Sequence, residues 1–155
     1  MKKETKTVVY DEELRIEAYR FEGIVQPFPN HFPGKGMNVD IKMLIQRIKG
    51  RPQMFVGEIG ELSLEILSSF IRGFLYSNIN ANRAETIDLT FMYDFHSWVK
   101  DKLEKSQNVE LDSGRNYVFY LSEVYKESKE QLDAFFELCE EFFEEVEKGN
   151  VTSRL

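Results

Sequence analysis

The sequence lacks the residues from which several kinds of functional site are built. It contains a single cysteine, Cys139, which excludes an internal disulfide and a zinc site made of several cysteines. His31 and His96 are its two histidines, and neither has a cysteine or a second histidine close to it in the chain. Ser113-Gly114 lacks the flanking pattern of a phosphate loop or a nucleophile elbow. We therefore expect a protein that is not an enzyme and that holds no metal and no cofactor.

Long apolar runs and an excess of positive charge are also missing. No segment approaches the ~18–20 consecutive apolar residues that span a bilayer, and no apolar stretch follows Lys2, Lys3 and Lys6 as it would in a secretory signal. Asp and Glu number 27 against 20 Lys and Arg, so the formal net charge is −7. A nucleic-acid-binding protein needs a basic face. These features predict a cytoplasmic protein that binds neither membranes nor nucleic acids.

The composition changes in a proline- and glycine-rich stretch at residues 25–36, which is typical of a loop. Before it, Thr5–Tyr10 and Leu14–Phe21 are expected to be short extended pieces, and in Leu14–Phe21 apolar and charged residues alternate with period two. After it, apolar residues recur at helical spacing, and hydrophobic residues make up 42% of the whole chain, which is enough for a core. We predict a mainly α protein with an extended leader and linker, residues 1–36, and a helical domain, residues 37–155.

Within the leader, Tyr10-Asp11-Glu12-Glu13-Leu14 and Phe28-Pro29-Asn30-His31-Phe32 resemble the opening of the effector-sensing domain of AraC-type transcription regulators. In that family the opening leads into a cupin barrel and, later, a DNA-binding helix-turn-helix pair. The resemblance covers residues 10–32 and stops there, because no series of strands follows. It implies a truncated leader joined to a protein whose own start is Met37. A genuine N-terminal hairpin is the alternative.

The helical domain is expected to form a small bundle of four to five helices. The predicted N-caps are Asn38 or Asp40 for the first helix, Ser63 for the second and Thr90 for the third, with polar loops at residues 78–83 and 108–116. In the second helix, Ser68, Ser69 and Gly73 would let a neighbouring helix approach closely.

The segment Tyr117–Leu121 suits a strand by composition, but its surroundings favour a short helix. A capping box, Ser128 to Gln131, is predicted to open the last helix, and Gly149 to end it. The apolar stripe of that helix must be covered, and we expect the other helices to cover it.

The segment Arg51-Pro52-Gln53-Met54-Phe55-Val56-Gly57 is similar to a turn of DNA gyrase B subunits and their ATPase relatives. In that family a glutamate base and a metal-holding Asn lie four residues apart on the next helix, whereas Glu65 here has Ser69 at that offset. We interpret the segment as a structural turn with Met54 and Phe55 in the core. The turn, the aromatic-rich helices and the acidic Phe-Phe-containing end also resemble small uncharacterised bacterial proteins, some of which are similar to immunity proteins of toxin systems.

The excess negative charge lies on the last helix, since residues 123–148 contain ten Asp or Glu and three Lys. One interpretation is a solvated outer face. The other is a docking surface for a basic protein, because clustered charge of one sign speeds encounter with the opposite sign. The predicted function is a non-enzymatic bacterial binding protein, with an immunity-type inhibitor as its specific form. The alternative is a truncated AraC-type remnant that pairs with a full-length regulator. The residues predicted to contact the basic partner are Glu137, Glu140, Glu141, Glu144 and Glu145.

The remaining chemically active side chains have structural interpretations. We expect His96 to lie on a helix surface or to cap a helix, Cys139 to be an inert core residue and Trp98 to be buried in the core. An enzyme is the third hypothesis, and it requires a pocket that gathers Asp94, His96, Arg51 or Glu58.

Overall fold

The computed structural model describes residues 7–11, 16–21, 24–27, 39–52 and 62–151. The chain divides into two compact units, Met1–Asn38 and Val39–Leu155.

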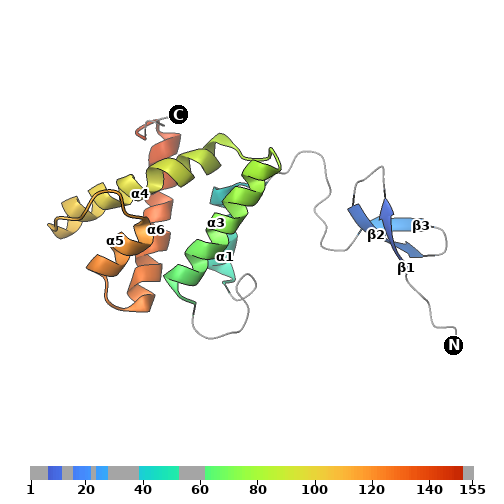
Figure 1. Ribbon diagram of the computed structural model, residues 1–155, viewed down its shortest axis with the longest axis horizontal. Helices are drawn as coiled ribbons and strands as arrows, with labels where there is room; N and C mark the ends of the chain where they lie inside the picture. The colour runs from blue at the N-terminus through green and yellow to red at the C-terminus, as the bar shows by residue number, and fades with distance from the viewer. Residues whose placement is uncertain (1–6, 12–15, 22–23, 28–38, 53–61, 152–155) are drawn as a thin grey trace. The chain divides into compact units, whose positions relative to one another are not determined.

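The N-terminal unit contains a three-stranded antiparallel sheet in the order β1-β2-β3 (Figure 1). Its strands are β1 (Thr7–Asp11), β2 (Ile16–Phe21) and β3 (Ile24–Pro27), and β2 pairs with both of the others. β1 overlaps the first segment predicted to be extended and ends one residue beyond it, and β2 lies within the second. β3 extends into the stretch that we predicted to be a loop, and its final proline is tolerated because β3 is an edge strand.

The C-terminal unit is helical (Figure 1). The prediction of a mainly α fold is confirmed, and the described residues form five helices, within the predicted four to five. Its described helices are α1 (Ile41–Gly50), α3 (Leu64–Asn80), α4 (Thr86–Gln107), α5 (Tyr117–Val124) and α6 (Ser128–Glu147). α6 packs against each of the other four. None of the described helices is both long enough and apolar enough to cross a membrane.

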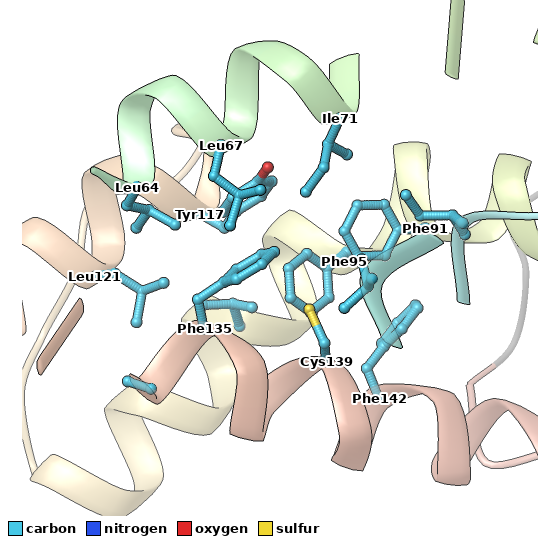
Figure 2. Close-up of a cluster of buried hydrophobic side chains, with 14 of the residues drawn as sticks. Leu64, Leu67, Ile71, Phe91, Phe95, Tyr117, Leu121, Phe135, Cys139 and Phe142 are labelled. Atoms are coloured by element: carbon cyan, nitrogen blue, oxygen red, sulfur yellow. The ribbon is translucent and has the colours of Figure 1, made fainter. Parts of the chain in front are cut away.

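Aromatic side chains fill the space between α4, α5 and α6 (Figure 2). The rings of Phe91 and Phe95 stack with centroids 4.4 Å apart, and Phe142 meets Phe95 edge-on at 5.1 Å. Pairs of this kind contribute about 0.5–1.5 kcal/mol beyond the burial of their area. The apolar stripe of α6 is therefore covered by the other helices, as we expected.

The helix starts differ from the predictions in two places. Asp40 and Ser63 cap α1 and α3 as predicted, since their side chains accept hydrogen bonds from the N–H groups of Met43 and Ile66. α4, however, begins four residues before the predicted cap, because Glu85 and Asp88 form a capping box. Thr90 is a buried residue inside the helix.

The predicted capping box of α6 is wrong as well. The cap residue is Glu127, and the side-chain amide of Gln131 donates to the carbonyl of Tyr125 at 2.9 Å. The short helix at residues 117–124 is confirmed, and the Asn116 side chain caps it by accepting from the Phe119 N–H at 2.8 Å.

α3 continues to Asn80, so the predicted loop at residues 78–83 starts too early. A Cβ added at Gly73 would have no neighbour within 4 Å in the described part of the chain, so no described helix makes the close approach that we predicted at this glycine. Met54 and Phe55, the predicted core residues of the turn, lie outside the described residues.

Candidate functional site

The acidic side chains of α6 lie opposite its buried face. Glu137, Glu140, Glu141 and Glu144 are exposed and Glu145 is half-buried, whereas Phe135, Cys139, Phe142 and Phe143 point into the bundle. The periodicity of α6 places the charges in this way, since residues three and four apart share a face.

Along the α4 edge of this face, lysine and tryptophan side chains bind the glutamates. The Lys102 Nζ lies 3.0 Å from Glu141 and 2.9 Å from Glu145. The indole N–H of Trp98 donates to Glu145 at 2.8 Å, and Lys102 lies over the Trp98 ring with its Nζ 5.2 Å from the centroid. Trp98 is half-buried: its ring packs against the core rings of Phe95 and Phe142, while its N–H lies at the helix–helix edge.

These contacts set the proton affinities of the cluster. The hydrogen bond from Trp98, followed by that from Lys102, lowers the pKa of Glu145. The hydrogen bonds to Glu145 and Glu141 raise the pKa of Lys102. Both groups are therefore charged at neutral pH, and the cluster ties α6 to α4.

Along the opposite edge, two lysines of α1 form ion pairs with α6. Lys42 pairs with Glu147, and Lys49 pairs with Glu140. The residues pair in opposite chain order, so α1 and α6 run antiparallel. Between these helices lies a groove of about 330 Å³ whose apolar lining comes from Ile45, Phe136, Cys139 and Phe143.

The centre of the face remains free of such pairs. Glu137 and Glu144 form no ion pair within the described parts of the chain, and the same holds for Glu130 and Asp133. All four side chains are exposed, and their spacings of three, four and seven place them on one line along α6. We call Glu130, Asp133, Glu137 and Glu144 the acidic stripe.

The structure therefore separates the five glutamates that we predicted to contact a partner. Glu137 and Glu144 belong to the acidic stripe. Glu140, Glu141 and Glu145 make intramolecular ion pairs that fix α6 between α1 and α4. The sequence alone did not indicate this division, because the partner lysines lie on helices distant in the chain.

His96 caps a helix, as expected. Its Nδ1 accepts a hydrogen bond from the backbone N–H of Tyr117, at the start of α5, at 3.0 Å. Its ring stacks on the ring of Tyr117, with centroids 5.1 Å apart. Burial and, secondarily, the positive charge of Arg72 lower the pKa of His96.

The groups required by the enzyme hypothesis are not brought together within the described residues. Asp94 lies two positions from His96 on α4, so it faces another direction, and its buried Oδ2 has no hydrogen-bond partner among the residues that the structure describes. Arg51 follows the end of α1, and Glu58 lies outside the described residues. Burial raises the pKa of the Cys139 thiol, which agrees with an inert core residue.

One residue that the sequence analysis missed is Asp88. Its buried carboxylate accepts hydrogen bonds from the backbone N–H groups of Ile41, at 2.7 Å, and Glu85, at 2.9 Å. The sequence does contain a signal for this cap. Glu85 and Asp88 are three residues apart, which is the spacing of a capping box, and both are acidic.

Comparison with known proteins finds similarity over one short segment. A stretch of 32 residues, 21% of this chain, is 62% identical to the "Uncharacterized HTH-type transcriptional regulator YbfI" of Bacillus subtilis (strain 168). The segment spans only 12% of that regulator's length. No family model matches the chain, and no solved structure matches it significantly. The chain thus contains a regulator-like segment, and its assignment to an effector-sensing domain stays a prediction.

Proposed function

We propose that residues 39–155 form a non-enzymatic binding module that docks a basic protein through the acidic stripe. The observation that supports this proposal is the contrast within one helix face. Its edges are neutralised by Lys42, Lys49 and Lys102, while the stripe has four exposed carboxylates without ion pairs in the described part of the chain. Such a concentration of charge costs self-repulsion and favours an oppositely charged surface.

The groove between α1 and α6 adds a place for an apolar anchor. Glu144 of the acidic stripe also lines this groove, so charged and apolar contacts adjoin each other. Binding energy at protein interfaces concentrates in buried anchors, whereas peripheral charges mainly speed association. We expect the partner to place an aliphatic or aromatic side chain against Phe136 and Phe143 and its basic groups along the stripe.

The proposal is tested with a charge reversal confined to the stripe. The full chain and the variant Glu137→Lys/Glu144→Lys serve as bait for protein capture from bacterial extract at low and high salt. The control variant reverses two exposed carboxylates away from α6, Glu65→Lys/Glu110→Lys. A partner that binds the full chain and the control, but associates about tenfold more slowly with the stripe variant at low salt, supports docking by the stripe.

Equal capture by all three baits contradicts the proposal. If the captured protein is a toxin, co-expression gives a second readout, because an immunity-type inhibitor restores growth only when it binds. We expect the full chain and the control variant to restore growth and the stripe variant to fail.

A second function rests on the match to the transcriptional regulator. In this proposal the regulator-like segment pairs with a full-length regulator of the AraC type, and the helical unit is secondary. Deletion of residues 1–36 is the experiment that distinguishes the two proposed functions. Loss of partner binding on deletion supports the second function, whereas full binding by residues 37–155 supports the first.

A further inference from the structure

Two adjoining cavities lie where α3, α4 and α5 meet. The inner one has a volume of about 60 Å³, and the outer one is an open hollow of about 500 Å³. His96 and Asn116 line both. Since a cavity of ~10–15 Å³ holds one water molecule, the inner cavity has room for a group of several heavy atoms.

Among the residues that the structure describes, the charged side chains at these cavities are all positive. Arg72 of α3 lines the inner cavity and Arg115, just before α5, lines the outer one, and no described Asp or Glu belongs to either lining. Neither arginine forms an ion pair within the residues that the structure describes. On a chain with a net charge of −7, this is a local surplus of positive charge.

Two polar side chains that line the cavities, His96 and Asn116, offer hydrogen-bond donors. The Nδ1 of His96 accepts from the Tyr117 N–H, so the neutral ring has its proton on Nε2, which is then a donor. The side-chain oxygen of Asn116 accepts from the Phe119 N–H, which leaves its amide group to donate. The Arg115 guanidinium lies 5.1 Å from the Phe119 ring centroid, and this contact limits its orientations.

We propose that Arg72, His96 and Arg115 form a binding site for a small oxyanion, either a phosphate or a carboxylate group. Guanidinium groups suit such ligands because their planar N–H donors match the geometry of two oxygen atoms. The start of α5 adds the partial positive charge of a helix N-terminus. The site is independent of the acidic stripe, since no residue of α6 lines either cavity.

The test is a titration of the full chain with inorganic phosphate and, separately, with acetate at constant ionic strength. His96 is one of two histidines, so its ring signals in NMR spectra are assigned with the variant His31→Gln. A bound anion offsets the charge of Arg72 and Arg115, and therefore the pKa of His96 rises on binding. We expect saturable shifts of the His96 signals and a raised His96 pKa with at least one of the two probes.

Two variants and a matched control assign the binding to these arginines. Arg72→Gln and Arg115→Gln each remove one charged donor, for which we expect about tenfold weaker binding. Arg83→Gln removes an exposed arginine in the α3–α4 connection and leaves the affinity unchanged. Saturation by one probe alone identifies the ligand group as phosphate or carboxylate.

Linear, unsaturable shifts with both probes would overturn the proposal. So would equal weakening in Arg83→Gln and in the two site variants, because the anion would then respond to overall charge rather than to this site. Circular dichroism of each variant checks that the helices are retained, and Arg115→Gln decides the outcome if Arg72→Gln fails to fold.

Discussion

The carboxylate of Asp88 on α4 accepts a hydrogen bond from the backbone N–H of Ile41, the first residue of α1, at 2.7 Å. Its other oxygen accepts from the N–H of Glu85, so one buried side chain, 47 residues after Ile41 in the chain, caps the starts of two helices. The N–H groups in the first turn of a helix have no partner within the helix. Asp88 therefore fixes how the lysine-bearing helix α1 meets α4.

Replacement of Asp88 by Ala should destabilise the helical unit by about 2–4 kcal/mol, because it removes a cap and leaves buried N–H donors without an acceptor. Urea unfolding followed by circular dichroism measures this loss. The control is Asp112→Ala in the exposed α4–α5 connection, for which we expect a change within about 0.5 kcal/mol. A cost for Asp88→Ala no larger than that of the control would contradict the capping role.

The sequence predicted the helices well and their termini less well. The caps that it identified, Asp40 and Ser63, bind N–H groups three residues ahead, so their signal is local. Asp88 also binds Ile41, and a contact between distant segments leaves no local pattern. Ser128 matches the capping-box motif, but Glu127 occupies the cap position and Gln131 instead bonds to the loop before the helix.

The difference between local patterns and contacts of distant segments also explains how much of the acidic face was predicted. The periodicity of α6 was sufficient to assign its buried and exposed sides. Which glutamates are neutralised depends on Lys49 of α1 and Lys102 of α4, whose positions follow from the packing of the bundle. The presence of Arg72 and His96 at the same cavity is likewise a product of packing, and composition alone indicated only an acidic chain.

The stability of the protein should fall as the pH drops below the ordinary pKa of histidine. Burial, followed by the charge of Arg72, lowers the pKa of His96 in the folded protein. His96 therefore binds a proton more readily in the unfolded chain than in the folded one. The unfolding free energy then rises with pH between the pKa of His96 in the folded state and its pKa in the unfolded state. The full stability is present above the unfolded-state pKa of about 6.5. Urea unfolding between about pH 8 and pH 5 measures the slope.

The variant His96→Gln should lose this pH dependence and be less stable by about 1 kcal/mol at the upper end of the range, where only the lost contacts with Tyr117 matter. The variant His31→Gln is the matched control, because it removes the other histidine. If the unfolding free energy of His96→Gln depends on pH as steeply as that of the unchanged protein, then another group causes this pH dependence.

The cluster of Trp98, Lys102 and Glu145 should give a pH dependence at acidic pH. Since its pKa is lowered in the folded state, Glu145 contributes stability above its unfolded pKa, and this contribution is lost as the pH falls through the folded pKa. Glu145→Gln should cost about 0.5–1 kcal/mol near neutral pH and nothing once the carboxyl is protonated. The measurement is the difference in unfolding free energy between the two proteins across this range.

Glu144→Gln is the matched control, because Glu144 is the exposed neighbour and forms no ion pair with any residue that the structure describes. Salt at about 1 M should reduce the effect of Glu145→Gln, since it screens the charge of Lys102. If Glu145→Gln lowers the unfolding free energy at low pH as much as it does at neutral pH, then Glu145 acts through packing alone.

Two glycines in the helical unit should respond to alanine in opposite directions. Gly73 lies in the middle of α3, is exposed, and has open space where a Cβ would be placed, so Gly73→Ala should raise the unfolding free energy by about 0.5–1 kcal/mol. Gly149 follows α6 with a φ of +74°, where a side chain is strained, and Gly149→Ala should lower the unfolding free energy by about 1 kcal/mol. Urea unfolding of both variants tests the contrast. Destabilisation by Gly73→Ala would mean that a segment of the chain packs against this position of α3 and that the glycine is needed there after all.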